Sequence, residues 1–111
     1  MASFIQVITT TDKREEAERI AQALVEARLA GCVQILGPVT SLYRWQGKVE
    51  RAGEWLCLVK TREDLYGAVE ERIRALHSYE TPEIVALPIA AGSGAYLAWL
   101  QASLAASGEA K

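Results

Sequence analysis

The order of the apolar segments constrains the fold of this chain more than any other feature of its sequence. Runs rich in β-branched and other apolar residues predict strands, and stretches with apolar residues at helical spacing predict helices. Strands are expected at residues 4–8, 32–45, 48–61 and 83–87, and helices between residues 12 and 31, at 65–76 and at 96–104. A strand–helix–strand unit is therefore followed directly by a second one, with a short helix added at the end.

The length of 111 residues suits one domain with its own hydrophobic core. Within one domain, the βαββαβ order is that of the split-βαβ, ferredoxin-like α+β sandwich. Residues 1–106 are expected to form this domain, and the polar tail at 107–111 is expected to fray.

Local signals predict where the first helix begins and ends. Asp12 is followed three residues later by Glu15, which is the spacing of a capping box, so Asp12 is expected to cap the helix. Gly31 supplies the expected stop.

The second and third strands predict an unusually long hairpin. Its arms have about thirteen to fourteen residues each, whereas strands usually have five or six. Gln46–Gly47 is the expected turn, Pro38 predicts a bend or bulge, and Ala52–Gly53 predicts a second break. Arms of this length project past a four-stranded sheet and leave backbone groups unpaired.

The projecting part of the hairpin is expected to be buried against other copies of the chain. Aromatic residues are enriched at protein interfaces, and the alternative is a hairpin that curls over its own helices. The residues expected at this interface are Tyr43, Trp45, Val49 and Trp55.

Charge and composition exclude several classes of protein. The net charge is −2 and the two signs are interspersed, so nothing resembles the basic stripe of a nucleic-acid-binding protein. No lipidation signal, membrane-length apolar run or signal peptide is visible, which predicts a cytoplasmic protein without membrane binding.

The cysteines are expected to be free thiols. A turn at Gln46–Gly47 would place Cys32 opposite Thr61 and Cys57 opposite Leu36, which is four positions out of register, or roughly 13 Å. Bulges at Pro38 and Gly53 would change this by a residue or two. A disulfide requires Cα atoms within about 7 Å.

Five segments in order along the chain resemble the CutA divalent-ion-tolerance family, and together they cover nearly the whole sequence. They are Ala30–Ile35, Ser41–Lys48, Glu54 with Leu58–Thr61, His77–Ile84 and Tyr96–Leu100. The resemblance implies the ferredoxin-like fold, a homotrimer built by pairing strands between subunits, and a role in tolerance of divalent metal ions, chiefly copper. Cu²⁺ or Zn²⁺ is the implied ligand, with no organic cofactor.

The resemblance also points to candidate metal ligands. Cys32, His77 and Glu83 combine thiolate, imidazole and carboxylate groups, which suit Cu²⁺ or Zn²⁺. Thr9 and Leu76 stand where some members of the family carry a cysteine and a second histidine.

A second set of residues is expected to line a polar cleft between subunits. It consists of Trp45, Lys60, Tyr79 and Glu83. The competing interpretation of this set is an ion pair with packing aromatics at a subunit junction.

No nucleophile-and-base pattern or nucleotide-binding fingerprint is visible, so catalysis is not expected. Two alternatives to weak binding of divalent cations stay open. One is a signalling trimer like the PII proteins, which would bind a small molecule, and the other is a passive structural trimer.

Overall fold

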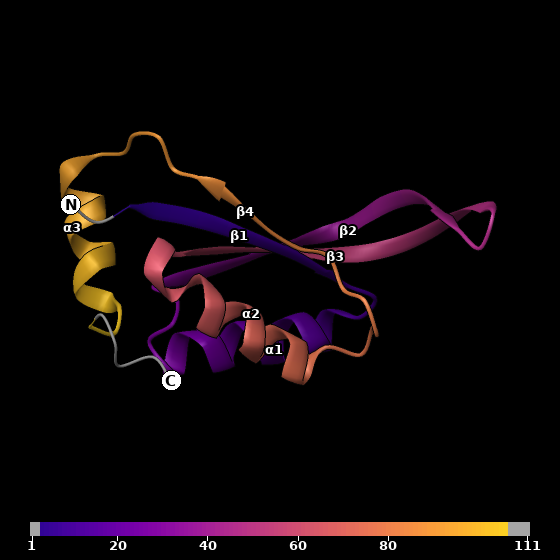
Figure 1. Cartoon of the computed structure of the whole chain (residues 1–111), viewed down its shortest axis with the longest axis horizontal. Helices are drawn as coiled ribbons and strands as arrows, with labels where there is room; N and C mark the ends of the chain where they lie inside the picture. The colour runs from indigo at the N-terminus through magenta and orange to yellow at the C-terminus, as the bar shows by residue number, and fades with distance from the viewer. Residues whose placement is uncertain (1–2, 107–111) are drawn as a thin grey trace.

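The computed structural model describes residues 3–106, so the tail expected to fray at 107–111 lies outside the described residues. Its strands are β1 (Phe4–Thr11), β2 (Cys32–Trp45), β3 (Lys48–Arg62) and β4 (Ile84–Pro88). Its helices are α1 (Arg14–Glu26), α2 (Tyr66–Leu76) and α3 (Gly94–Ser103), and a 3-10 turn at Glu63–Leu65 precedes α2. The predicted order of elements is confirmed (Figure 1).

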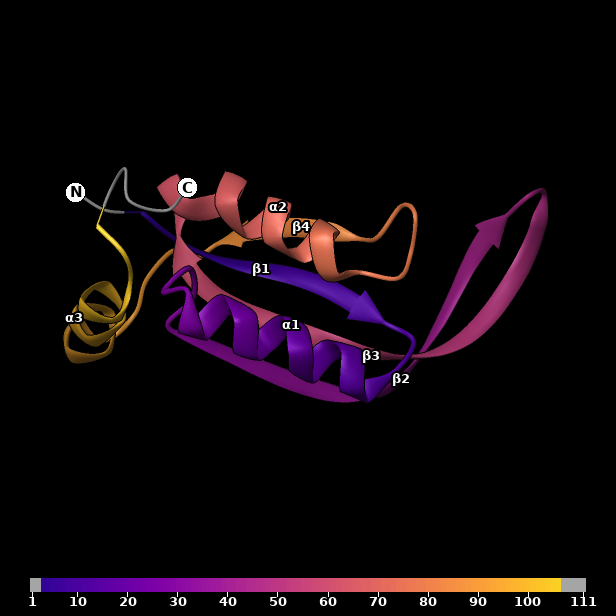
Figure 2. The same cartoon turned by 90° about the horizontal axis from the view of Figure 1, so that it is seen from below.

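The four strands form one antiparallel sheet in the order β2-β3-β1-β4. Helices α1 and α2 lie on the same face of this sheet and leave the opposite face uncovered by either of them (Figure 2). We call the uncovered side the open face. This arrangement confirms the predicted ferredoxin-like α+β fold, and β2 and β4 are its two edge strands, which explains why Pro38 and Pro88 are tolerated there.

The core lies between the sheet and the two helices that cover it. Successive side chains of a strand point to opposite faces, so alternate residues of β1 and β3 meet the apolar stripes of α1 and α2. The fully buried apolar side chains of this cluster are Val7, Ala17, Ile20, Leu24, Cys57, Val59, Val69 and Ile73. Burying each large aliphatic side chain stabilises the fold by about 1.5–3 kcal/mol.

Thr9 is fully buried within this layer, and its hydroxyl has no hydrogen-bond partner in the described part of the chain. We expect Thr9→Val to raise the free energy of unfolding by about 1 kcal/mol, because an unpaired buried polar group is costly and valine has a similar shape. Urea unfolding measures the gain, with Thr40→Val at an exposed strand position as the control. A loss of stability in Thr9→Val would show that the hydroxyl is satisfied, for example by a buried water.

The predicted capping box at the start of α1 is wrong. Strand β1 continues to Thr11, and the helix begins at Arg14 with Lys13 in the cap position and no side-chain cap. The Thr11 hydroxyl instead donates a hydrogen bond to the Lys13 carbonyl at 2.8 Å. Asp12 therefore lies in the turn between β1 and α1, one residue too early to cap the helix.

The predicted stop at Gly31 is also wrong. Helix α1 ends at Glu26, and Arg28, with φ of 60°, is the residue that takes the left-handed conformation. Gly31 has a different role, because a Cβ atom there would lie 2.5 Å from Leu100 Cδ1. The missing side chain lets α3 pack closely against the start of β2.

Two arginines hold the end of α3. The Arg28 guanidinium donates to the carbonyls of Ala102 at 2.9 Å and of Ser103 at 3.3 Å. The guanidinium of Arg62, which is buried, donates to the Ala105 carbonyl at 2.7 Å and also pairs with Asp64. The last carbonyls of a helix lack partners within the helix, so the contacts of Arg28 satisfy two of them. The contact of Arg62 holds the chain just after the helix, and together the two arginines fasten α3 to the body of the protein.

Strands β2 and β3 form the long hairpin, which projects away from the body at the end opposite α3 (Figure 1). Gln46 and Gly47 have φ values of 50° and 80°, which confirms the predicted tight turn. The ladder shifts between Leu36 and Val39, as Pro38 predicted, but the break predicted at Ala52–Gly53 is wrong because both residues are paired in a regular ladder.

The bulge changes the cysteine register by one residue. Cys32 pairs with Lys60 and Cys57 pairs with Ile35, and both cysteines are free, as predicted.

Trp55 does not belong to the projecting part of the hairpin, contrary to the prediction. It pairs with Thr11 of β1, is half-buried, and packs against the core cluster. Its ring lies against Gly37, where a Cβ atom would approach Trp55 Cε3 to 2.7 Å. Tyr43, Trp45 and Val49 are exposed, as expected of a projecting ribbon.

Candidate functional site

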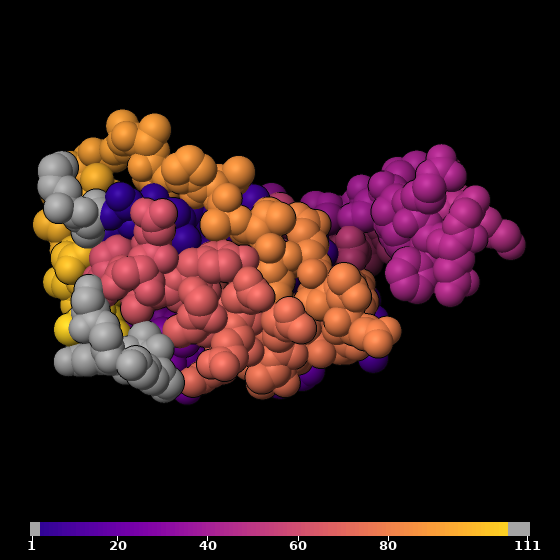
Figure 3. Space-filling model, viewed as in Figure 1, coloured from indigo at the N-terminus to yellow at the C-terminus, as the bar shows by residue number. Residues whose placement is uncertain are grey.

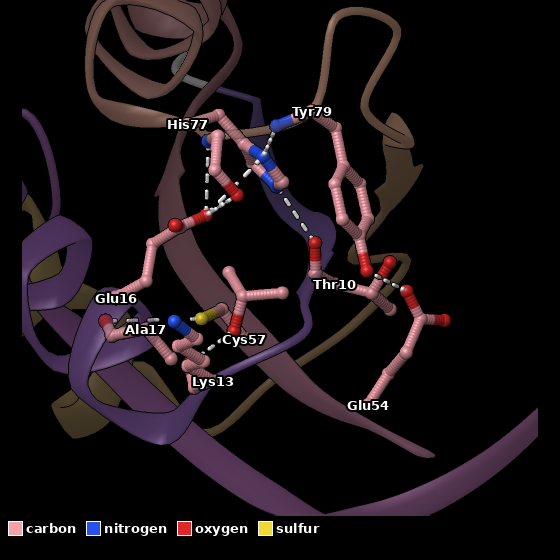
Figure 4. A network of polar contacts seen from close by, with 10 residues as sticks. Thr10, Lys13, Glu16, Ala17, Glu54, Cys57, His77 and Tyr79 are labelled. Carbon is pink, nitrogen blue, oxygen red and sulfur yellow. Dashed lines mark hydrogen bonds and ion pairs between the residues drawn. The ribbon is translucent and has the colours of Figure 1, made fainter. Parts of the chain in front are cut away.

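A network of polar residues lies where the covering helices meet the base of the hairpin (Figure 4). The network is centred on the segment 77–83, which connects α2 to β4. Hydrogen bonds join this segment to the end of β1, to the first turn of α1 and to β3. Its central residue is His77, whose side chain is fully buried. This segment contains two of the three ligands that the sequence predicts.

Both ring nitrogens of His77 have partners within the chain. Nε2 lies 2.7 Å from the Thr10 carbonyl oxygen, which can only accept, so Nε2 carries a proton and donates. Nδ1 accepts from the Tyr79 backbone N–H at 3.1 Å when the ring is neutral. Metal ligation by either nitrogen would require one of these hydrogen bonds to break.

Glu16 is the charged neighbour of this histidine. Its carboxylate is almost fully buried, and Oε2 accepts from the backbone N–H and the hydroxyl of Ser78 at 3.1 and 3.2 Å. The same oxygen lies 3.3 Å from Nδ1 of His77. Protonating the ring would turn Nδ1 into a donor to Glu16 and would remove the acceptor of the Tyr79 N–H, so these two arrangements exclude each other.

Tyr79 connects the network to the hairpin. Its hydroxyl donates to Oε2 of Glu54 at 2.8 Å, and the ring lies 4.9 Å from that of His77, centroid to centroid. Burial raises the pKa of Tyr79 well above its usual value, and the hydrogen bond to the Glu54 carboxylate adds to the shift. The phenol therefore stays protonated and remains a donor near neutral pH.

The predicted metal ligands do not meet within one chain. Cys32 pairs with Lys60, which pairs with Gln6 of β1, whereas His77 contacts Thr10 four residues further along that strand. The separation along the sheet is roughly 13 Å. Within residues 3–106, no group of three His, Cys, Asp or Glu side chains is placed to hold a metal ion.

Glu83 lies nearer to His77 than Cys32 does. It directly precedes β4, whose first residue Ile84 pairs with Thr9 near the same end of β1. Its side chain is exposed. The two predicted ligands of the segment 77–83 thus share one end of the sheet, and Cys32 lies toward the other.

The predicted cleft residues are also spread along the molecule. Lys60 Nζ donates to Gln34 Oε1 at 2.7 Å, and Tyr79 contacts β3 at Glu54, six residues or roughly 20 Å further along. Trp45 lies near the hairpin tip, and its exposed side chain is far from both. A cleft made from these residues would have to be shared by more than one copy of the chain.

The two thiols differ in environment. Cys57 is fully buried with Sγ 4.0 Å from the Ala17 carbonyl oxygen, and burial raises its pKa to about 11, with a smaller effect from Glu16. It therefore remains a neutral thiol near pH 7 and is inert as a nucleophile. Cys32 is partly exposed, so it is the cysteine that a metal ion can reach.

Apolar side chains gather on the open face. Val33 and Ile35 of β2 pack against the core, so Leu36 points to the other side, where it is 56% exposed. On β4, Val85 and Leu87 are 45% and 50% exposed and pair with Ile8 and Gln6 of β1. Tyr96 and Trp99 of α3 add two exposed aromatic rings at the end of the sheet, with ring centroids 5.5 Å apart.

An open groove lies elsewhere, between β4, the start of α2 and α3, and is lined mainly by apolar and small side chains such as Phe4, Tyr66, Pro88 and Leu97. None of the predicted site residues lines it. The polar network, by contrast, contains the predicted site residues His77 and Tyr79.

Sequence reasoning missed the partners of His77 and Tyr79 in the network, which are Thr10, Glu16 and Glu54. Glu16 had a usable signal, because it stands four residues before Ile20 and so falls on the apolar stripe of α1. A charged residue on the buried side of a helix indicates a buried partner. Glu54 had no such signal, since its partner Tyr79 is distant in sequence.

Comparison with known proteins identifies the family. The model of the CutA1 divalent ion tolerance protein family matches residues 5–103. The chain belongs to the CutA family. Among its relatives, the divalent-cation tolerance protein CutA of Thermus thermophilus is 53% identical over 95 residues, which cover 86% of this chain and 92% of the relative.

Two further comparisons come from plants. The chloroplastic protein CutA of Arabidopsis thaliana is 41% identical over 99 residues, and this chain spans about half of it, 54%. The crystal structure of CutA1 from Oryza sativa superposes with a TM-score of 0.92 at 40% identity, covering 95% of this chain and 96% of that one. The predicted family and fold are thus both confirmed. In the part of this CutA-family chain that the structure describes, no helix is long and apolar enough to cross a membrane.

Proposed function

We propose that this CutA-family protein is a homotrimer that contributes to tolerance of divalent metal ions, chiefly copper, by binding them weakly at sites shared between subunits. The family supports the relation to divalent cations. The proposal includes no catalytic role. It also places the protein in a reducing compartment, the cytoplasm, because both cysteines are free thiols.

The open face is the single observation that supports assembly most strongly. Leu36, Val85 and Leu87 expose about half of their side chains there, and large exposed apolar patches are typical of interaction surfaces. Within residues 3–106, the outer edges of β2 and β4 pair with no other strand, and such edges are usually covered or paired. Association of identical copies through this face and these edges would bury both.

Weak, shared metal binding follows from the placement of the candidate ligands. Cys32 and Glu83 are accessible but lie toward opposite ends of the sheet, and both nitrogens of His77 are engaged. One chain therefore offers one or two ligands at any point, whereas metal sites in proteins normally use three or four. Assembly is the means by which ligands from different copies would meet.

Two measurements test the proposal. Light scattering after size exclusion, at several protein concentrations, is expected to give three times the chain mass. Titration with Cu²⁺ is expected to show saturable binding that weakens in Cys32→Ser and Glu83→Gln, with Glu71→Gln on the exposed side of α2 as the control. A monomeric mass would overturn the assembly. Equal, non-stoichiometric binding in all variants would remove the ligand assignment and favour a structural trimer.

A further inference from the structure

The sheet loses its third strand at the base of the hairpin. Strand β1 pairs with β3 from Arg62 to Trp55, so Glu54 is the first residue of β3 beyond the cover of β1. From there outward, residues 39–54 form a two-stranded ribbon that stands apart from the body (Figure 3). An isolated two-stranded ribbon is only marginally stable, so contacts at its base decide its direction.

Contacts at this base come from several elements. The β2 bulge lies against Trp55, and the Arg14 guanidinium of α1 sits 5.3 Å from the Trp55 ring centroid. These two contacts hold Trp55, which is the last residue of β3 that pairs with β1. The contact with the ribbon itself is made by Tyr79, whose hydroxyl donates to Glu54 at 2.8 Å.

Tyr79 is fixed at its other end. Its backbone N–H donates to His77 Nδ1, and His77 Nε2 donates to the Thr10 carbonyl near the end of β1. A chain of contacts therefore runs from β1 through the segment 77–83 to the first residue of the ribbon. The Glu54 carboxylate at the end of this chain belongs to a residue that is only 8% exposed, which favours a single geometry.

We infer that Tyr79 and Glu54 act as a strut that fixes the direction of the ribbon, so that the segment 77–83 controls how the hairpin meets a second copy of the chain. The inference rests on the proposed self-association. A ligand that engages Nδ1 of His77 would take away the acceptor of the Tyr79 N–H, and would thereby release Tyr79 and change the direction of the ribbon. Tyr79 is on this account a positioning residue.

The test measures the direction of the ribbon by a distance between two spin labels. The labels are placed at the exposed residues Arg19 on α1 and Glu50 on the ribbon, each changed to cysteine, in a Cys32→Ser background that leaves only the buried Cys57. Labelled chains are diluted into an excess of unlabelled chains before assembly, so that each distance comes from one chain. Subunit exchange is followed by native mass spectrometry on the same variants.

Tyr79→Phe is expected to increase the population outside the main distance peak roughly tenfold or more, because it removes a hydrogen bond to a charged group. Subunit exchange is expected to accelerate with it. Glu54→Gln keeps an acceptor oxygen but loses the charge, so it is expected to give a smaller increase than Tyr79→Phe. Tyr66→Phe, which removes a tyrosine hydroxyl that donates to the Ile84 carbonyl away from the ribbon and the open face, is the matched control.

The outcomes separate this inference from the proposed function. A Tyr79→Phe distribution identical to that of Tyr66→Phe would overturn the strut, whatever the oligomeric state. A wild-type protein that is monomeric at every concentration would overturn the assembly, while the distance measurement would still decide whether the strut exists.

Discussion

Replacing Arg62 with methionine is expected to lower the free energy of unfolding by about 2–3 kcal/mol, because several hydrogen bonds to a buried guanidinium are lost at once. The side chain is 5% exposed. It forms an ion pair with Asp64 and donates hydrogen bonds to the Gln101 side chain and to the Ala105 carbonyl. Asp64 is 40% exposed, so its carboxylate regains hydration in the variant, and the loss stays below that of a fully buried ion pair. Denaturant unfolding at one fixed protein concentration measures the change.

The matched control for Arg62 is Arg74→Met. Arg74 pairs with Glu70 at 3.6 Å on the surface of α2, with 64% of its side chain exposed. Exposed pairs of this kind contribute about 0–1 kcal/mol, so little change is expected. Early cleavage near residues 101–106 by a protease in Arg62→Met, with the rest of the chain protected, would confirm that the arginine fastens α3. Equal stability of the two variants would contradict this role.

His77→Ala is expected to destabilise the protein by about 2–4 kcal/mol in the absence of any metal, since it opens a cavity and removes partners from two backbone groups. These are the Thr10 carbonyl and the Tyr79 N–H. Thermal and denaturant unfolding in the presence of a chelator measure the loss. Glu83→Gln, at an exposed position of the same segment, is expected to change stability by less than about 0.5 kcal/mol.

The difference in expected stability between His77→Ala and Glu83→Gln decides how copper titrations of the two variants are interpreted. Weaker binding by His77→Ala is compatible with collapse of the segment 77–83, whereas weaker binding by Glu83→Gln points to a ligand. If His77→Ala unfolds at the same denaturant concentration as the wild type, the buried network does not stabilise the fold, and direct ligation by the imidazole gains support.

The fold could be predicted because the signals for its helices, strands and turn lie in short stretches of sequence. Apolar runs, helical spacing and the Gln46–Gly47 turn each depend on neighbouring residues, and the structure confirms the elements they predict. The start of α1 shows the limit of such signals. Asp12 has the right chemistry for a cap, but the pairing of β1 with β3 extends the strand to Thr11 and moves the helix start beyond Asp12.

The candidate site could be predicted only in part, because its contacts join residues that are distant in sequence. His77 and Tyr79 were identified, but their partners Thr10, Glu16 and Glu54 come from other elements. The separation of Cys32 from His77 likewise depends on strand order and register, which residue types alone do not determine. The ligand set and the cleft stay predictions about an assembly.

The bulge in β2 changes which face of the hairpin the odd-numbered side chains of this strand occupy. Before the bulge, Val33 and Ile35 face the helices and pair with odd-numbered residues of β3. After the bulge, Tyr43 and Trp45 pair with the even-numbered residues Glu50 and Lys48. Because side chains alternate strictly along a strand, one inserted residue moves every later odd-numbered side chain of β2 to the other side. Both exposed rings of the ribbon consequently continue the side that carries Leu36. A length change of one residue at this point would turn them toward the helix side without altering any residue of the ribbon.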